Sequence, residues 1–398
     1  MSLDLKSRFN EIADFLKPYE KIYSLEFLKR YPAPYPTFMN KWLLEMRQWD
    51  DKKLAELESC PHEDLVFDQD FKDYLYSIRT LSIIPKSRIS KSLLPPELTH
   101  GLNQKKIHEL SLLKTRVNDS KAMLIFDIGG GIGHTSLMAV HGTSKRSVCV
   151  DQDLKLLDKG MKKLKKIKGL QESQVRFQHL KIDSSMDLSK SEKNLTIGLH
   201  SCGDLSAHVL NTYLKSSHEL ILFGCCYHKI NNSLYLSKES KLNRLELTTN
   251  ALHLASRSAK KVNDKEILKR KSFKRHRYCL HYFMNDQFNT SFSGIGNSAP
   301  KDYQRPFSAY AKGIEDYGEL KSIPSEDLDR FYEDKETIEL FNDNFNADIL
   351  RLLLGRLIEL YIILDRALYL EEQGIKVKVS EVFDRSLSPR NIMLEAGF

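Results

Sequence analysis

The stretch FDIGGGIGHTSL, residues 126–137, holds four glycines within five residues just after an aspartate. A short apolar run, AMLIF at 122–126, leads into it. Glycine adopts left-handed backbone conformations without steric cost and lets a backbone approach a ligand closely. The stretch therefore predicts a strand, a tight turn and the start of a helix, with a bound group next to the glycines.

Three kinds of glycine-rich loop compete for this pattern. A phosphate-binding P-loop needs lysine after its last glycine, and here His134 follows, which excludes that class. The dinucleotide fingerprint G-x-G-x-x-G is matched only in part, because His134 stands at the position of its third glycine. An acid followed by alternating glycines, the loop that binds S-adenosylmethionine, is matched by Asp127, Gly129, Gly131 and Gly133.

Acids at the ends of the next two strands support S-adenosylmethionine as the cofactor. Asp151 ends an apolar strand 24 residues after Asp127, where an acid meets ribose hydroxyls in nucleotide-binding sheets, and Gln152 follows it. Asp183 ends the third strand, where we expect it to hold the adenine amino group. We expect Asp127 to take the cofactor ammonium and His134 to belong to the same site. The alternative is a structural Rossmann-like domain with an empty site.

A helix just before the first strand carries His108. In related folds this helix covers the cofactor, so His108, with Lys105 and Lys106, is expected to reach the cofactor carboxylate. The alternative is a solvated helix face.

Strands and helices alternate after about residue 119, which predicts an open parallel sheet with helices on both faces. Five strands are expected near 122–128, 147–153, 175–183, 195–204 and 219–226, with helices at 134–142, 154–169 and 204–216. Two more strands, near 375–383 and 388–397, resemble the last pair of a class I methyltransferase sheet, in which the final strand is antiparallel. The expected fold class is α/β, a Rossmann-like class I methyltransferase sheet.

This pattern divides the chain into four segments. Residues 1–104 form a helical N-terminal region, and 105–230 form the methyltransferase core with the cofactor site. Residues 231–373 form a helical, partly basic insertion, and 374–398 form the strand pair that completes the sheet. The apolar stretch 352–370 carries four charged residues, too many for a membrane span, and predicts a buried amphipathic helix.

The net charge of +8 is concentrated in two segments. Residues 259–278 carry +7 and residues 155–168 carry +6, which leaves −5 on the remainder. The segment from Lys260 to Arg277 predicts contact with a polyanion, RNA or a ribosomal component. Solvated helix faces are the alternative for both segments. No membrane contact is expected.

Six cysteines without a CxxC pair, and no apolar signal segment after Met1, predict a reduced, cytoplasmic location, with the nucleus as the other possibility.

Several short stretches resemble the methyltransferase-like protein 25 family, which includes proteins described as ribosomal RNA adenine dimethylase domain-containing. They are KKIHEL at 105–110, FDIGGGIGH at 126–134, GLHSCGDLS at 198–206, GCCYHKI at 224–230 and SPRN at 388–391. The resemblance implies a class I fold with S-adenosylmethionine as cofactor. LHSCG is also similar to the KHLCG element of the tRNA methyltransferase 13 family, which methylates a ribose hydroxyl.

The residues after the fourth strand argue against adenine N6 chemistry. Enzymes that methylate this atom carry Asn/Asp-Pro-Pro-Tyr/Phe or a close variant there, and this chain has HSCGD at 200–204, with neither proline nor aromatic residue.

The loops after strands four and five supply the catalytic candidates. His200 or His228 is predicted to act as general base, Asp204 to orient it and Tyr227 to stack on a planar substrate. Each has a structural alternative, such as a hydrogen bond within the loop. No metal is expected, because the adjacent Cys225 and Cys226 suit a tetrahedral site poorly.

These observations predict an S-adenosylmethionine-dependent methyltransferase acting on RNA or a ribosome-associated macromolecule. The alternatives are a protein methyltransferase and a non-catalytic scaffold that binds RNA or a ribosomal partner.

Overall fold

Strand β1, Leu124–Ile128, is the apolar run before the glycines, and it lies at the centre of a sheet. The computed structural model describes residues 3–182, 193–216, 218–257, 261–290 and 298–398. In these residues the sheet has seven strands in the order β3-β2-β1-β4-β5-β7-β6. The other strands are β2 Arg146–Asp151, β3 Val175–His179, β4 Asn194–Cys202, β5 Glu219–Cys225, β6 Val377–Glu381 and β7 Ile392–Ala396.

Strands β1 to β5 run parallel to their neighbours, and β7 runs antiparallel to both β5 and β6. The predicted fold class, including the antiparallel last strand, is confirmed. Because parallel strands end at the same edge, the loops that follow β1, β2, β4 and β5 share one edge of the sheet. We call this the carboxyl edge.

Two compact units make up the chain. The first, which contains the sheet, comprises Met1–Lys17, Leu81–Lys260 and Gly355–Phe398, and the second comprises Pro18–Thr80 and Lys261–Leu354. The segments 1–104 and 231–373 predicted from the sequence are each divided between the two units.

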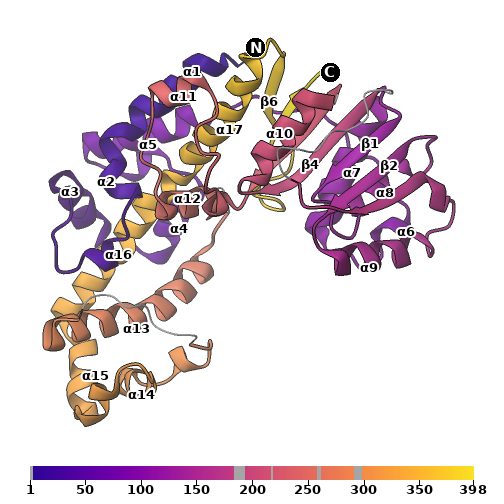
Figure 1. The fold of residues 1–398 in the computed structure, drawn as a ribbon. Helices are drawn as coiled ribbons and strands as arrows, with labels where there is room; N and C mark the ends of the chain where they lie inside the picture. Colours follow the sequence, from indigo (N-terminus) through magenta and orange to yellow (C-terminus); the bar gives the residue numbers. More distant parts are fainter. Residues whose placement is uncertain (1–2, 183–192, 217, 258–260, 291–297) are drawn as a thin grey trace. The chain divides into compact units, whose positions relative to one another are not determined.

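Helices of the first unit pack on the sheet through apolar faces. Leu110 and Val117 of one helix and Met138 of another share a buried cluster with Ile125 of β1 and Ile197 of β4. Figure 1 shows these helices, α7 and α8, beside the strands. The helices of this unit are α1 Leu5–Leu16, α6 Pro96–Thr99, α7 Gln104–Asp119, α8 His134–Val140, α9 Leu154–Leu164, α10 Leu205–Ser216, α11 Lys238–Leu242, α12 Thr249–Arg257 and α17 Gly355–Glu371, with 3-10 turns η4 Glu172–Gln174 and η5 Tyr227–Lys229.

Helix α17 is buried on all sides, so burial of the predicted helix is confirmed from Gly355 onward; its amphipathic character is not, and residues 352–353 belong to α16. Its charged residues are paired: Glu359 accepts hydrogen bonds from Arg356 and Arg390 at 2.8 Å each, and Asp365 pairs with Arg366 at 2.8 Å. Pairing is required because an isolated buried charge is strongly unfavourable. No helix in the described residues is long and apolar enough to cross a membrane.

The second unit is helical. Its longest helix, α13 Asp264–Phe288, buries Cys279, Leu280 and Phe283 against Phe307 and Leu328. The remaining elements are α2 Glu20–Tyr23, α3 Thr37–Met46, α4 Asp51–Ser59, α5 Gln69–Leu81, α14 Phe307–Lys312, α15 Ser325–Glu333 and α16 Lys335–Leu353, with 3-10 turns η1 Lys17–Tyr19, η2 Phe27–Arg30, η3 Glu63–Leu65, η6 Asp302–Gln304 and η7 Gly318–Ser322.

Helix α9 packs unusually closely on the sheet at Gly160. A Cβ at this position would lie 2.5 Å from the carbonyl oxygen of Ile132 and against the ring of Phe177. Gly160→Ala, which stabilises an ordinary helix, should therefore lower the free energy of unfolding by about 1–3 kcal/mol. The exposed Lys159→Ala on the same helix should change it by less than about 0.5 kcal/mol. Urea denaturation of the two variants makes the comparison, and equal stability would contradict close packing here.

Candidate functional site

The glycine loop joins β1 to α8 at the carboxyl edge. Gly129 and Gly131 have φ angles of 69° and 58°, in the region that favours glycine. The Gly131 N–H donates to Asp151 Oδ2 at 2.8 Å, which ties the loop to the end of β2. A Cβ on Gly129 would touch Leu205 at 3.0 Å, so the loop also lies against the start of α10.

Open space adjoins Gly131. A Cβ there would meet only Leu156 at 3.6 Å and Asp151 Oδ2 at 4.0 Å. Gly133 differs, because a Cβ there would lie 2.7 Å from the Phe177 ring. Of these two predicted glycines, Gly133 is therefore required for packing, whereas Gly131 leaves room beside a carboxylate.

Asp127 is buried, and its Oδ2 accepts hydrogen bonds from the Ser136 N–H at 3.1 Å and hydroxyl at 2.9 Å. Burial raises the pKa of Asp127 to about 6, while the charge of Lys106 acts in the opposite direction. The carboxylate thus holds the first turn of α8 and lies within the electrostatic reach of Lys106.

The other predicted cofactor residues occupy different places. His134 begins α8, and its Nδ1 lies 3.3 Å from Lys163 Nζ; burial and nearby lysines lower its pKa to about 4, so the ring is neutral. Gln152 is exposed, and its carbonyl oxygen lies 3.0 Å from a ring nitrogen of His179. Asp183 lies outside the described residues.

His108 does not face the cofactor position. Its Nε2 accepts a hydrogen bond from the Asp384 N–H at 2.9 Å, and its ring packs edge-on against Phe383. The prediction that His108 reaches the cofactor carboxylate is therefore wrong, because this side chain holds the loop after β6. Lys106, near Asp127, is better placed for that contact.

His200 lies where β4 is irregular. The pairing register with β5 shifts between Gly198 and Ser201, and His200 has a φ of 61°. Such irregularities re-aim side chains, and a strained residue of this kind is frequent at functional sites. The His200 side chain is 23% exposed and its Nε2 lies 2.9 Å from Glu109 Oε1.

Glu109 of α7 is a site residue that the sequence analysis missed. It is almost fully buried and also accepts a hydrogen bond from the Ser388 hydroxyl at 2.7 Å. Burial alone would raise its pKa, but the contacts with His200 and Ser388 and the charge of Lys106 lower it below the usual range. The available signal was its position three and four residues after Lys106 and Lys105.

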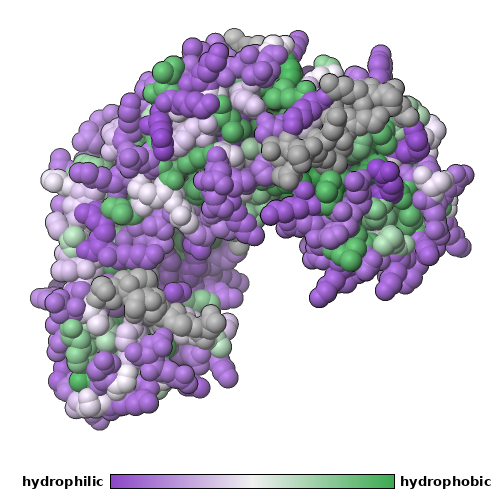
Figure 2. Space-filling view, viewed as in Figure 1, coloured by the Kyte–Doolittle hydropathy of each residue, from purple (hydrophilic) through white to green (hydrophobic). Residues whose placement is uncertain are grey.

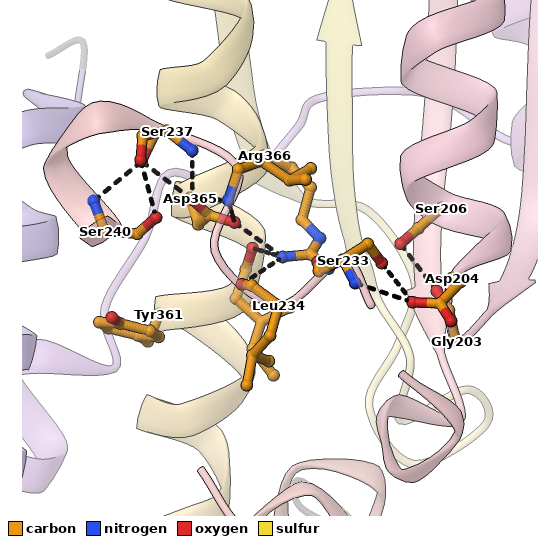
Figure 3. A network of polar contacts seen from close by, with 12 residues as sticks. Gly203, Asp204, Ser206, Ser233, Leu234, Ser237, Ser240, Tyr361, Asp365 and Arg366 are labelled. Atoms are coloured by element: carbon orange, nitrogen blue, oxygen red, sulfur yellow. Dashed lines mark hydrogen bonds and ion pairs between the residues drawn. The ribbon is translucent and has the colours of Figure 1, made fainter. Parts of the chain in front are cut away.

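Asp204 does not orient His200. Its carboxylate accepts hydrogen bonds from the backbone N–H groups of Asn231, Asn232 and Ser233 and from the Ser233 hydroxyl at 2.5 Å. Figure 3 shows Asp204 pointing to Ser233, whose carbonyl oxygen in turn accepts from Arg366. The predicted orienting role is wrong because these donors occupy the carboxylate. Asp204 instead fixes the loop that follows η5.

Tyr227 cannot stack on a substrate in this conformation. It is only 3% exposed, its ring lies against Gly224, and its hydroxyl donates to Glu359 at 3.1 Å. The stacking prediction is therefore wrong, and Tyr227 anchors the end of β5 to α17. His228 is partly exposed; its ring stacks on His253 at 4.4 Å and its Nδ1 lies 3.1 Å from the Ser256 hydroxyl.

Three cysteines meet where β4 and β5 end. Cys202 pairs in register with Cys225, and their sulfurs lie 3.0 Å apart. The sulfur of Cys226 lies within 4.8 Å of both. The sequence argument that adjacent cysteines suit one site poorly is wrong here, because Cys226 has a left-handed backbone (φ 47°, ψ 47°) rather than an extended one.

Comparison with known proteins agrees with this geometry. Residues 105–233 match a family model described as a methyltransferase domain. They include the glycine loop, the HSCGD stretch and the cysteine cluster, and the sheet has the strand order and single antiparallel strand expected of class I enzymes. Residues 105–233 thus match a methyltransferase domain, and the sheet has the class I arrangement.

Several solved structures are similar to parts of this chain at low identity. A provisionally named RNA methyltransferase from Pyrococcus horikoshii is 16% identical, with 35% of this chain and 68% of that chain covered and a TM-score of 0.26. Coclaurine N-methyltransferase, bound to N-methylheliamine and SAH, is 11% identical, with 88% and 94% covered and a TM-score of 0.28. PKMT2 from Rickettsia typhi, in complex with AdoHcy, is 16% identical, with 61% and 39% covered and a TM-score of 0.22. TM-scores this low do not establish a shared fold over the aligned lengths.

The methyl donor of a class I domain is S-adenosylmethionine, and the residues present fit it. The space beside Gly131 adjoins the Asp151 carboxylate, which suits ribose hydroxyls. Lys106 and Asp127 bring a cation and a carboxylate close together, which suits the carboxylate and ammonium of an amino acid.

Filling the space beside Gly131 should therefore prevent cofactor binding. Gly131→Arg should abolish binding of S-adenosylhomocysteine in titration calorimetry, because its side chain would occupy that space. Gly142→Arg is the matched control, since Gly142 also has a positive φ, precedes β2 at the opposite edge and has no atom within 4 Å of its Cβ position. Both variants carry about 1–2 kcal/mol of backbone strain. Equal affinities would place the cofactor elsewhere.

Proposed function

We propose that this methyltransferase domain transfers a methyl group to an RNA atom that loses a proton in the reaction, in the simplest case a ribose hydroxyl. The observation that carries the proposal is the Glu109–His200 pair, which places an oriented imidazole at the carboxyl edge beside the glycine loop. The similarity of LHSCG to an element of ribose-methylating enzymes points in the same direction.

The pair defines which nitrogen accepts the proton. Glu109 has a lowered pKa and is ionised at neutral pH, so it only accepts hydrogen bonds. His200 Nε2 must therefore carry a proton, and Nδ1 is the basic nitrogen of the neutral ring. Nδ1 has no hydrogen-bond partner within the part of the chain that the structure describes.

These residues perform the proton chemistry of the transfer. When bound, S-adenosylmethionine supplies an electrophilic methyl group on a sulfonium. His200 Nδ1 takes the proton that the acceptor hydroxyl releases as it is methylated, and Glu109 stabilises the resulting imidazolium. Burial keeps Glu109 in place, and Ser388 fixes the orientation of its carboxylate.

Unpaired lysines on α9 and on the turn that follows it, residues 165–168, support RNA as the substrate class. Six of them are exposed, and among the described residues none has a carboxylate within 4.0 Å: Lys155, Lys159, Lys162, Lys165, Lys166 and Lys168. Helix α9 begins just after Asp151, so these charges belong to the domain that holds the cofactor. Figure 2 shows hydrophilic residues along the surface where Figure 1 draws α9.

The basic segment from Lys260 to Arg277, predicted to bind a polyanion, is partly neutralised. Arg270 pairs with Glu58, Lys271 with Asp51 at 2.5 Å, and Lys274 with Asp348 at 2.7 Å. Paired charges release few counterions from RNA, so they contribute less to binding than the free lysines of α9.

Removing the base should abolish turnover and preserve cofactor binding. His200→Gln and Glu109→Gln should each lower methyl transfer from radiolabelled S-adenosylmethionine to total RNA, taken from cells lacking the protein, by roughly 10²-fold or more. Affinity for S-adenosylhomocysteine should change little. Lys241→Gln, an exposed change on α11 away from the pair and from the α9 lysines, is the control. Full turnover in both variants would make the pair structural, and label appearing in protein instead of RNA would refute the substrate class.

Charge reversal on α9 should weaken RNA binding. Lys155→Glu, Lys159→Glu and Lys162→Glu combined should flatten the salt dependence of binding, by about 0.7 in log–log slope for each lost phosphate contact. The triple Arg270→Gln, Lys271→Gln and Lys274→Gln, which removes the paired cations of α13, should have the smaller effect. Fluorescence anisotropy with a single-stranded RNA, titrated at several salt concentrations, measures the effect of each triple. A larger effect of the α13 triple would show that α13, and not α9, contacts the RNA.

A further inference from the structure

We propose that Cys202, Cys225 and Cys226 form a binding site for a thiophilic divalent cation, zinc in the simplest case, with its fourth coordination position open. All three sulfurs lie within 4.8 Å of one another. A tetrahedral zinc with sulfur at about 2.3 Å requires sulfurs about 3.8 Å apart, so small rotations of the side chains bring the cluster to that geometry.

The backbone positions all three sulfurs on one side. Cys202 and Cys225 are the last residues of adjacent strands and are register partners. Successive residues of a strand point to opposite faces, so Cys226 would point away if β5 continued. Its left-handed conformation instead returns its side chain to the other two, at the strain cost typical of functional sites.

The ligand set is that of a soft metal. Three thiols without a carboxylate favour zinc or a similar thiophilic ion over magnesium or calcium. No fourth His, Cys, Asp or Glu joins the group in the described ranges. Three protein ligands with an open position are typical of catalytic zinc, whereas structural zinc takes four.

The cluster lies at the carboxyl edge beside the proposed base. The Cys202 thiol lies 3.4 Å from the carbonyl oxygen of His200. Cys225 is buried, and Cys202 and Cys226 are partly exposed residues, so an ion would be reached from the side of these two residues. An open position there could take a water or an acceptor atom.

A disulfide is the competing interpretation of the short distance between Cys202 and Cys225. It would use two of the three sulfurs and would leave the strained conformation of Cys226 unexplained. It would also cross-link residues whose strands are already paired. The convergence of three sulfurs favours a metal.

Metal analysis of the full chain tests the proposal without depending on the RNA substrate. Protein purified in a phosphine reductant without chelator should contain about one zinc per chain, measured by inductively coupled plasma mass spectrometry. After zinc removal, added cobalt(II) should give thiolate-to-cobalt charge-transfer absorption. Cys226→Ser, at a half-exposed position, and Cys225→Ser should each lower affinity for cobalt by more than about 10-fold. Cys60→Ser, outside the cluster, should not.

Two results would overturn the site. One is folded wild-type protein, binding S-adenosylhomocysteine normally, that retains no zinc and shows no thiolate–cobalt band. The other is a metal-free protein in which peptide mapping finds Cys202 and Cys225 joined by a disulfide. Because S-adenosylhomocysteine binding is read separately, failure of the metal site and failure of the methyltransferase assignment are distinguishable.

Discussion

The buried carboxylate of Glu359 is the constraint on which the shape of the carboxyl edge depends. A desolvated carboxylate must be compensated by several donors, and here Arg356, Arg390 and the Tyr227 hydroxyl supply them. These partners come from α17 itself, from the connection between β6 and β7, and from the end of β5. The Glu359 carboxylate thereby connects α17 to the end of β5 and to the β6–β7 connection. Removing one partner would leave the buried carboxylate with fewer donors and disconnect one of these elements from it.

Glu109 has the same role nearer to the glycines. It joins α7 to the irregular end of β4 through His200 and to the loop before β7 through Ser388. The short SPRN stretch thus provides a partner to each buried glutamate, Ser388 to one and Arg390 to the other. Most motif residues at this edge serve to build it: the Asp204 carboxylate, the Tyr227 hydroxyl and His108 Nε2 each bond to the protein. Among the described residues His200 Nδ1 has no hydrogen-bond partner, and Cys202 and Cys226 are partly exposed residues, which is why the chemistry is assigned to them.

The ion pairs in the structure change which basic segment is expected to bind a polyanion. The segment around α13 has the larger formal charge, but several of its cations face carboxylates in the same unit. Such pairs leave little field for an external polyanion. The lysines of α9 have a smaller total and no such partners among the described residues, so more of their charge is available to a phosphate backbone.

The sequence by itself determined the strands and the glycine loop, because these follow from local periodicity and turn chemistry. The antiparallel final strand was expected from the resemblance of the last strand pair to class I methyltransferase sheets, and the structure supplied the order of the strands. It also placed HSCGD and GCCYH at the ends of neighbouring strands. The tertiary structure decided what each side chain does there. The partner of His200 is 91 residues away, that of Tyr227 is 132 away and that of His108 is 276 away, and no local pattern encodes such pairings. The convergence of three sulfurs depended on a register pair and on one left-handed residue, Cys226, whose conformation is set by the packing around it and not by its own preference.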